Sequence, residues 1–225
     1  MWAGVLDIQG MIFILEIIGT VAFALSGVMI AIKKELDILG VVVVGTVTAV
    51  GGGAVRDILL GKLPPTLFVK PVYALVAIGT SLVAFLIACR SGHSFLNRIE
   101  RFNPIINVFD AVGLGIFAVV GVNAAIQANL SHNAFLSIFL GTITGVGGGL
   151  MRDQLVGDIP MVLKKRVYAL AALIGSSVFY LLHQLRFLDV VSLSSGVGCV
   201  ILIRLLASHY KWNLPRIHLT ESSES

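Results

Sequence analysis

Charged residues are scarce in this sequence. Only 12% of its 225 residues are Asp, Glu, Lys or Arg, whereas 57% are hydrophobic and the mean hydropathy is +0.97. Soluble domains carry about 25% charged residues, so the composition excludes an ordinary soluble fold and predicts an integral membrane protein. The net charge of +4 comes without a nucleic-acid-binding motif. We therefore attribute the basic residues to membrane topology and expect no nucleic-acid partner.

Cysteine and histidine are sparse too. The two cysteines, Cys89 and Cys199, lie in or at the ends of apolar runs, which favours small packing residues over a disulfide or a metal site. The five histidines are scattered without the spacing of zinc ligands. No nucleophile, base and orienting group stand together. We therefore expect no metal site, no resident cofactor and no enzymatic activity. Membrane lipids are the expected partners and could also bind as ligands.

Apolar runs long enough to cross a bilayer fill nearly the whole chain. A helical span needs about 20 apolar residues, and these long runs lack the alternation of membrane barrel strands. The sequence therefore predicts an all-α integral membrane protein, a single membrane domain over 1–225 with seven transmembrane helices. The predicted spans are 11–32, 38–60, 69–89, 105–127, 134–156, 167–182 and 187–207.

Lysine and arginine are unevenly distributed between the predicted spans. With the N-terminus outside, ten of them fall on the inner side and three on the outer side. Because basic loops stay cytoplasmic, this predicts an outer N-terminus, a cytoplasmic C-terminus and a location in the inner membrane. Arg56, Arg152 and Arg204 are left in or near the spans. Tyr73 and Tyr168 fit an aromatic belt at the membrane interface.

The chain contains an internal repeat. The stretch GTVTAVGGGAVRDILLGKLP from Gly45 matches GTITGVGGGLMRDQLVGDIP from Gly141 at twelve of twenty positions. Upstream, EIIGTVAFALSGV from Glu16 matches DAVGLGIFAVVGV from Asp110, and a VYAL segment follows both copies. Each repeat thus covers three helices, and an odd number of spans inserts the second copy upside down. The sequence predicts two inverted three-helix repeats.

The repeats set the organisation of the chain. The first repeat covers 11–92, the second covers 104–184, and a seventh helix over 185–207 stands outside the duplication. The segment 93–103 between the repeats has the pattern of a short amphipathic surface helix. The tail over 208–225 is polar, and we predict that it is disordered.

Three adjacent glycines interrupt the second and the fifth span. Each costs a helix roughly 1 kcal/mol relative to alanine and leaves the backbone uncovered, so we expect thin helices that are kinked or broken. Two explanations remain: close packing of helices through small residues, or a polar pathway lined by freed backbone groups. The duplication in inverted repeats favours the pathway. The glycines are Gly51, Gly52, Gly53, Gly147, Gly148 and Gly149.

Six charged residues fall in or near the spans of the repeats. The predicted topology places Glu16, Arg56 and Asp57 near the outer face. It places Asp110, Arg152 and Asp153 near the inner face. Because burying a single charge is costly, we expect Glu16 to pair with Arg56, and Asp110 with Arg152. The alternative is that the two arginines only extend to the lipid headgroups.

The duplicated motifs GGGAVRDILLGKLP and GGGLMRDQLVGDIP resemble those of the prokaryotic TRIC family, the trimeric intracellular cation channels, which is also labelled a glycine-transporter family. The resemblance covers nearly the whole chain. It implies a homotrimer in which each seven-helix protomer has its own water-filled pore. Glycine kinks in the second and fifth helices would border that pore, and monovalent cations such as potassium would pass through it.

One position departs from the animal branch of the family, which has a lysine where this chain has Val146. The resemblance therefore does not extend to gating by that lysine. Arginine beside a pore repels cations, so we expect the four carboxylates near Arg56 and Arg152 to neutralise them.

Three functions fit these observations. The first is a passive channel permeable to potassium, which the family resemblance favours. The second is a secondary transporter of a small solute such as glycine, which inverted repeats with broken helices support equally well. The third is a structural membrane protein whose helices pack through glycine.

Overall fold

The computed structural model describes residues 8–99, 103–164, 167–210 and 212 of the chain. In this part the chain has seven helices long and apolar enough to cross a membrane, which confirms the predicted fold class, and two helices of four residues. The long helices are α1 (Ile8–Lys33), α2 (Ile38–Leu59), α4 (Val72–Ile99), α5 (Asn103–Gln127), α6 (Ala134–Leu155), α8 (Val167–Gln184) and α9 (Asp189–His209). The short ones are α3 (Thr66–Val69) and α7 (Met161–Lys164).

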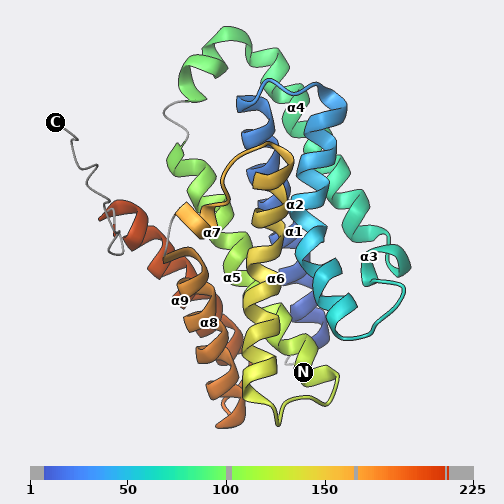
Figure 1. The fold of residues 1–225 in the computed structure, drawn as a ribbon, viewed down its shortest axis with the longest axis vertical. Coiled ribbons are helices and arrows are strands. Elements are labelled where there is room, and N and C mark those ends of the chain that lie inside the picture. Colours follow the sequence, from blue (N-terminus) through green and yellow to red (C-terminus); the bar gives the residue numbers. More distant parts are fainter. Residues whose placement is uncertain (1–7, 100–102, 165–166, 211, 213–225) are drawn as a thin grey trace, which may run out of the picture.

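The two repeats form two bundles that run in opposite directions (Figure 1). Helices α1, α2 and α4 form the first bundle, and α5, α6 and α8 form the second. Helix α5 packs against α1, α6, α8 and α9, while α2 and α6 pack against each other between the bundles. Helix α9 has no counterpart in the first repeat and packs on α5 and α8. The predicted inverted architecture is therefore present.

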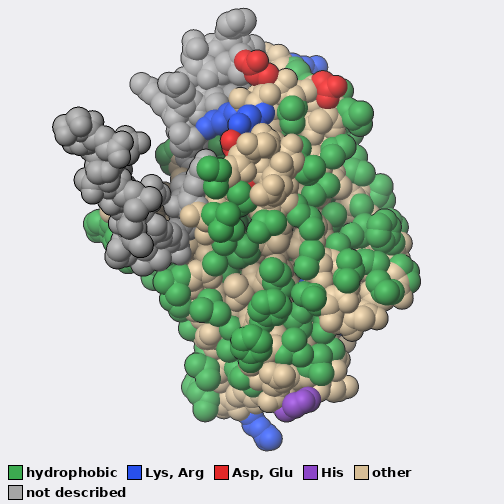
Figure 2. All heavy atoms as spheres, in the orientation of Figure 1, with side chains coloured by type: hydrophobic (Ala, Val, Ile, Leu, Met, Phe, Trp, Pro, Cys, Tyr) green, Lys and Arg blue, Asp and Glu red, His purple; other side chains and the backbone are tan. Residues whose placement is uncertain are grey.

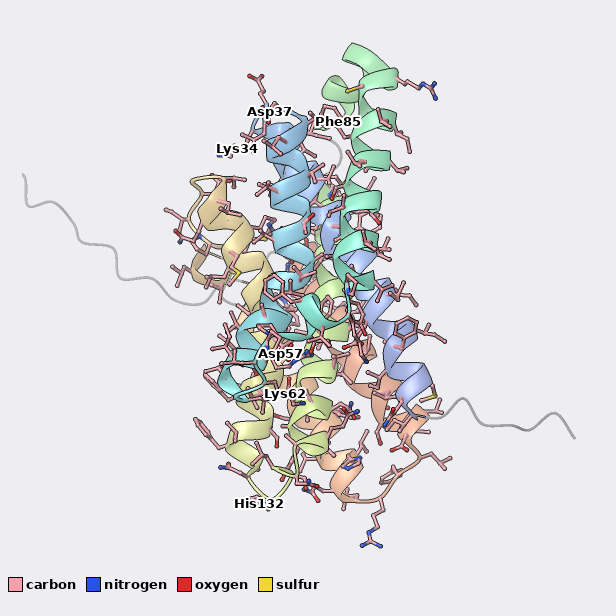
Figure 3. The ribbon with its side chains drawn as sticks, turned by 90° about the vertical axis from the view of Figure 1, so that its right-hand side faces the viewer. Lys34, Asp37, Asp57, Lys62, Phe85 and His132 are labelled. Carbon is pink, nitrogen blue, oxygen red and sulfur yellow. The ribbon has the colours of Figure 1, made fainter. Side chains whose placement is uncertain are left out.

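We name the two ends of the molecule after the predicted topology. The inner end carries Lys34 and Asp37, and the outer end carries His132 (Figure 3). Hydrophobic side chains cover most of the face between these ends, and the charged side chains on that face gather near the ends (Figure 2). An apolar surface between two polar ends is what a helical bundle in a bilayer requires, because lipid solvates only apolar groups.

Helices α2 and α6 end in the same way. Gly61 and Gly157 follow them with φ angles of 68° and 71°, in the left-handed region that favours glycine. The backbone N–H of the residue after each glycine donates to the carbonyl of Asp57 or Asp153 at 2.8 Å, which closes a Schellman turn. Each turn reverses the chain directly after an Arg-Asp pair. The final glycine of the repeated motif thus fixes where these charges lie.

The connection between the repeats differs from the prediction. Helix α4 runs without interruption to Ile99, so no separate surface helix begins at residue 93. The sequence has no proline between Val72 and Pro104 that would stop the helix earlier. Residues 100–102 lie outside the described part. At the other end of the chain α9 continues to His209, and the predicted tail lies outside the described residues except at 208–210 and 212.

Candidate functional site

The triple glycines lie where α2 and α6 cross. Both helices are continuous through them, so the expected break is absent, and the expected kink stays a prediction. A Cβ on Gly52 would overlap the carbonyl oxygen of Thr144, and a Cβ on Gly148 would overlap that of Thr48. Close contact with the opposite backbone offsets the low helix propensity of glycine, which explains why the helices do not break. At Gly52 and Gly148 the close-packing explanation therefore holds.

The third glycine of each triplet has a different environment. A Cβ on Gly53 would meet only the Nη2 atom of Arg56, at 3.8 Å, and Gly53 lines a cavity. A Cβ on Gly149 would lie 2.6 Å from the hydroxyl of Tyr168. Equivalent positions are thus open in the first repeat and filled in the second.

This difference between the glycines gives a stability test. We expect Gly148→Ala to lower the free energy of unfolding by about 1–3 kcal/mol, because the helices must separate to admit the methyl group. Gly53→Ala is the matched control and should be neutral or stabilising, since alanine favours helix by about 1 kcal/mol. Thermal unfolding in detergent measures both. Equal melting temperatures for the two variants would contradict the close-packing assignment.

Four side chains form a cluster toward the outer end, which we call the outer cluster: Glu16, Arg56, Asp57 and Tyr73. The Arg56 guanidinium lies 2.8 Å from Asp57 and 4.0 Å from Glu16. Tyr73 donates a hydrogen bond to Glu16, and Asp57 accepts one from the backbone N–H of Thr66, the first residue of α3, at 2.7 Å. The predicted Glu16 and Arg56 pair is therefore present but long, and the adjacent Asp57 is the closer partner.

A cavity opens onto the outer cluster. Its wide part measures about 320 Å³ and reaches toward the outer end, with Lys62 and Lys70 in its lining. A second cavity of about 40 Å³, which we call the narrow part, shares the side chains of the outer cluster with the first and is also lined by Thr20, Gly53 and Phe117. Since a water molecule needs at least about 10–15 Å³ by this measure, the narrow part admits only a few waters. Figure 3 shows Asp57 and Lys62, which both line the wide part, near each other in the half of the molecule that carries His132.

Five side chains form the corresponding inner cluster: Asp110, Arg152, Asp153, Tyr168 and Arg204. Arg152 lies 2.7 Å from Asp110 and 2.9 Å from Asp153. Asp153 accepts a hydrogen bond from the first backbone N–H of α7, as Asp57 does at α3. The predicted pair of Asp110 and Arg152 is confirmed. Arg56 and Arg152 are buried beside carboxylates, so the alternative that they extend to the headgroups is wrong.

The two clusters differ in access and charge. The side chains of Asp110 and Arg152 are 0% exposed, whereas that of Glu16 is 17% exposed and faces the cavity. The formal charges of Glu16, Arg56 and Asp57 give the outer cluster a net charge of −1. The inner cluster is neutral, because Arg204 adds a second cation.

Three residues have roles that were not predicted from the sequence. Tyr73 and Tyr168 are buried and bond to or approach Glu16 and Asp110, so the aromatic-belt assignment is wrong for both. The two tyrosines occupy equivalent positions in the repeats, and this was the signal in the sequence that they share a role. Arg204 was noted only as lying near a span, although an arginine inside an apolar helix is itself a sign of a function or a buried partner.

Comparisons with known proteins agree with this architecture. A family model described as glycine transporter matches residues 13–88 and 107–184. The UPF0126 inner membrane protein YadS of Escherichia coli K12 is 37% identical over 214 residues, covering 94% of this chain and 99% of that protein. A UPF0126 membrane protein of Deinococcus radiodurans is 35% identical, covering 92% of each chain.

Solved structures are similar over nearly the whole chain. A TRIC cation channel structure is 37% identical with a TM-score of 0.80, covering 93% of this chain and 98% of that one. The TRIC trimeric intracellular cation channel orthologue from Rhodobacter sphaeroides is 31% identical with a TM-score of 0.80, covering 91% and 100%. These neighbours are channels and not enzymes, which agrees with the prediction from the sequence.

Proposed function

We propose that this chain, which belongs to the TRIC channel family, forms a channel for monovalent cations such as potassium, with one pore in each protomer. The cavity at the outer cluster is the observation that carries the proposal. It leads from the outer end to Thr20, Gly53 and Phe117 and holds a net charge of −1 at its narrow part. A low-dielectric passage with an excess carboxylate concentrates cations.

The carboxylates that neutralise the arginines explain why a pore beside Arg56 and Arg152 can pass cations. Asp57 lies against Arg56, and Asp110 and Asp153 lie against Arg152. The Glu16 carboxylate is only weakly neutralised by Arg56, because the two groups lie 4.0 Å apart. The permeant cation would meet Glu16 and the Thr20 hydroxyl before the stacked rings of Phe23 and Phe117, whose centroids are 5.4 Å apart.

We also propose a homotrimer in the inner membrane with the N-terminus outside, in contact with membrane lipids. The Escherichia coli relative is named an inner membrane protein, and the Rhodobacter sphaeroides neighbour is described as trimeric. The excess of basic residues at the predicted inner end supports the orientation.

Recording from purified protein in planar lipid bilayers tests the channel function. We expect unitary currents whose reversal potential in a potassium chloride gradient lies toward that of potassium. The absence of current across a range of voltages and cations, with the protein shown to be inserted in the bilayer, would overturn the proposal.

A secondary transporter is the second candidate, favoured by one observation. The outer cluster opens to a cavity while the Asp110 and Arg152 side chains at the inner cluster are fully buried, as in a carrier that faces one side at a time. Saturable uptake of radiolabelled glycine into proteoliposomes, without unitary currents, would support the transporter over the channel.

Two lysines in the cavity lining give a further test of the pathway. Lys62 and Lys70 are exposed and repel incoming cations, so Lys62→Gln with Lys70→Gln should raise potassium conductance about twofold at low salt and lose this effect near 1 M salt. Arg186→Asn is the control, because it removes a cation from a loop between spans outside the lining of this cavity. The same increase in the control would contradict a local effect.

A further inference from the structure

Helix α9 lies outside the duplication, yet it contributes a side chain to the inner cluster. Arg204 is 3% exposed, and its Nη2 atom lies 3.4 Å from Asp110. Its guanidinium carbon lies 4.6 Å from the centre of the Tyr168 ring, a cation–π contact. Helix α9, which is part of neither repeat, thus contacts the Asp110 and Arg152 pair of the second repeat through Arg204.

The first repeat shows the same arrangement without such an arginine. Tyr73 has Phe13 beside its ring, with centroids 6.2 Å apart, and its hydroxyl bonds to Glu16. The space next to Gly53 is open. In the second repeat the Tyr168 ring lies under Arg204. Its hydroxyl fills the space next to Gly149 and donates only a long hydrogen bond of 3.4 Å to Asp110.

We propose that Arg204 holds the inner half of the pathway closed. When its guanidinium leaves Asp110 and the Tyr168 ring, the Tyr168 hydroxyl withdraws from Gly149 and shortens its hydrogen bond to Asp110, so that the second repeat takes the open arrangement that the first repeat already has. Arg204 is thus a positioning residue that acts through Tyr168. This inference rests on the proposed channel function for its effect on current, but the movement itself does not depend on which solute passes.

The hydrogen bonds of the two arginines explain how such a movement is possible. Asp110 is held by Arg152 at 2.7 Å and by Arg204 only at 3.4 Å. Within the described part of the chain, the buried Nε of Arg204 has no hydrogen-bond partner. Arg204 can therefore move away while Arg152 stays 2.7 Å from Asp110, so that this carboxylate keeps one cationic partner.

Single-channel recording of Arg204→Met tests the proposal. Methionine keeps the length and the apolar character of α9 but removes the charge, so we expect the open probability to rise at least threefold with the unitary conductance unchanged. Leu202→Ala is the control, since Leu202 is on the same helix and 59% exposed. An open probability that is unchanged or lower in folded Arg204→Met protein would overturn the proposal.

Thiol labelling gives a readout that does not require current. Ser26 is buried and accepts a hydrogen bond from Arg152 at 2.7 Å. In a background with both native cysteines replaced by alanine, Ser26→Cys should react slowly with a membrane-impermeant maleimide added at the inner end. Arg204→Met should speed this reaction at least threefold.

The two readouts separate the possible failures. A wild-type protein that carries no current would overturn the proposed function, while labelling would still decide whether Arg204 closes the inner half. Labelling at the same rate with and without Arg204→Met would overturn the inference alone. If Arg204→Met does not fold, Arg204→Lys carries the same comparison, because lysine keeps the charge but lacks the planar face that lies on Tyr168.

Discussion

Arg152→Met is expected to destabilise the folded protein by about 3–5 kcal/mol, the largest change in stability that we predict for a single substitution. Arg152 is 0% exposed and lies within 2.9 Å of two buried carboxylates, Asp110 and Asp153. With methionine at this position both carboxylates lose their nearest positive charge. Arg204 lies near Asp110 only, and at the longer distance of 3.4 Å. Loss of the folded fraction during a denaturant titration in detergent measures the effect.

Arg56→Met is the matched control for this substitution, since it removes the equivalent arginine of the first repeat. We expect a smaller loss of stability, because Glu16 is 17% exposed in a cavity where water can solvate it, whereas the equivalent Asp110 is 0% exposed. If both variants lost the same stability, the difference in access between the two clusters would be contradicted.

The fold was largely predictable because it depends on two signals that a sequence carries directly. Span length follows from the thickness of the bilayer, and inversion follows from a three-helix repeat. The connection at residues 93–99 was not predictable in this way. Its polar residues suggested a surface helix, but polarity does not stop a helix, and α4 continues to Ile99.

The glycines show where reasoning from one helix fails. Helix propensity alone predicts a break at three glycines, but the contact of Gly52 with Thr144 and of Gly148 with Thr48 belongs to two helices together. The charged pairs were predictable because depth in the membrane follows from topology. The contribution of Arg204 was not, because nothing in the repeat pattern places α9 beside Asp110.

The location of the unpaired negative charge leads to the second large prediction. Glu16 supplies the net charge of −1 at the narrow part of the cavity, since Arg56 and Asp57 neutralise each other at 2.8 Å. A unit charge about 6 Å from a permeating cation contributes on the order of 1 kcal/mol in a partly hydrated site. Glu16→Gln should therefore lower the potassium conductance about fivefold at low salt, while glutamine still accepts the Tyr73 hydrogen bond.

Salt and a matched variant decide whether this effect is local. Asp189→Asn removes a carboxylate from the first turn of α9, away from the residues that line the cavity, and should leave the potassium conductance unchanged. The loss in Glu16→Gln should diminish near 1 M potassium chloride, where the screening length is about 3 Å. If Glu16→Gln conducted as well as Asp189→Asn at low salt, cations would not pass the outer cluster. The cavity at Glu16 would then have to be excluded from the pathway.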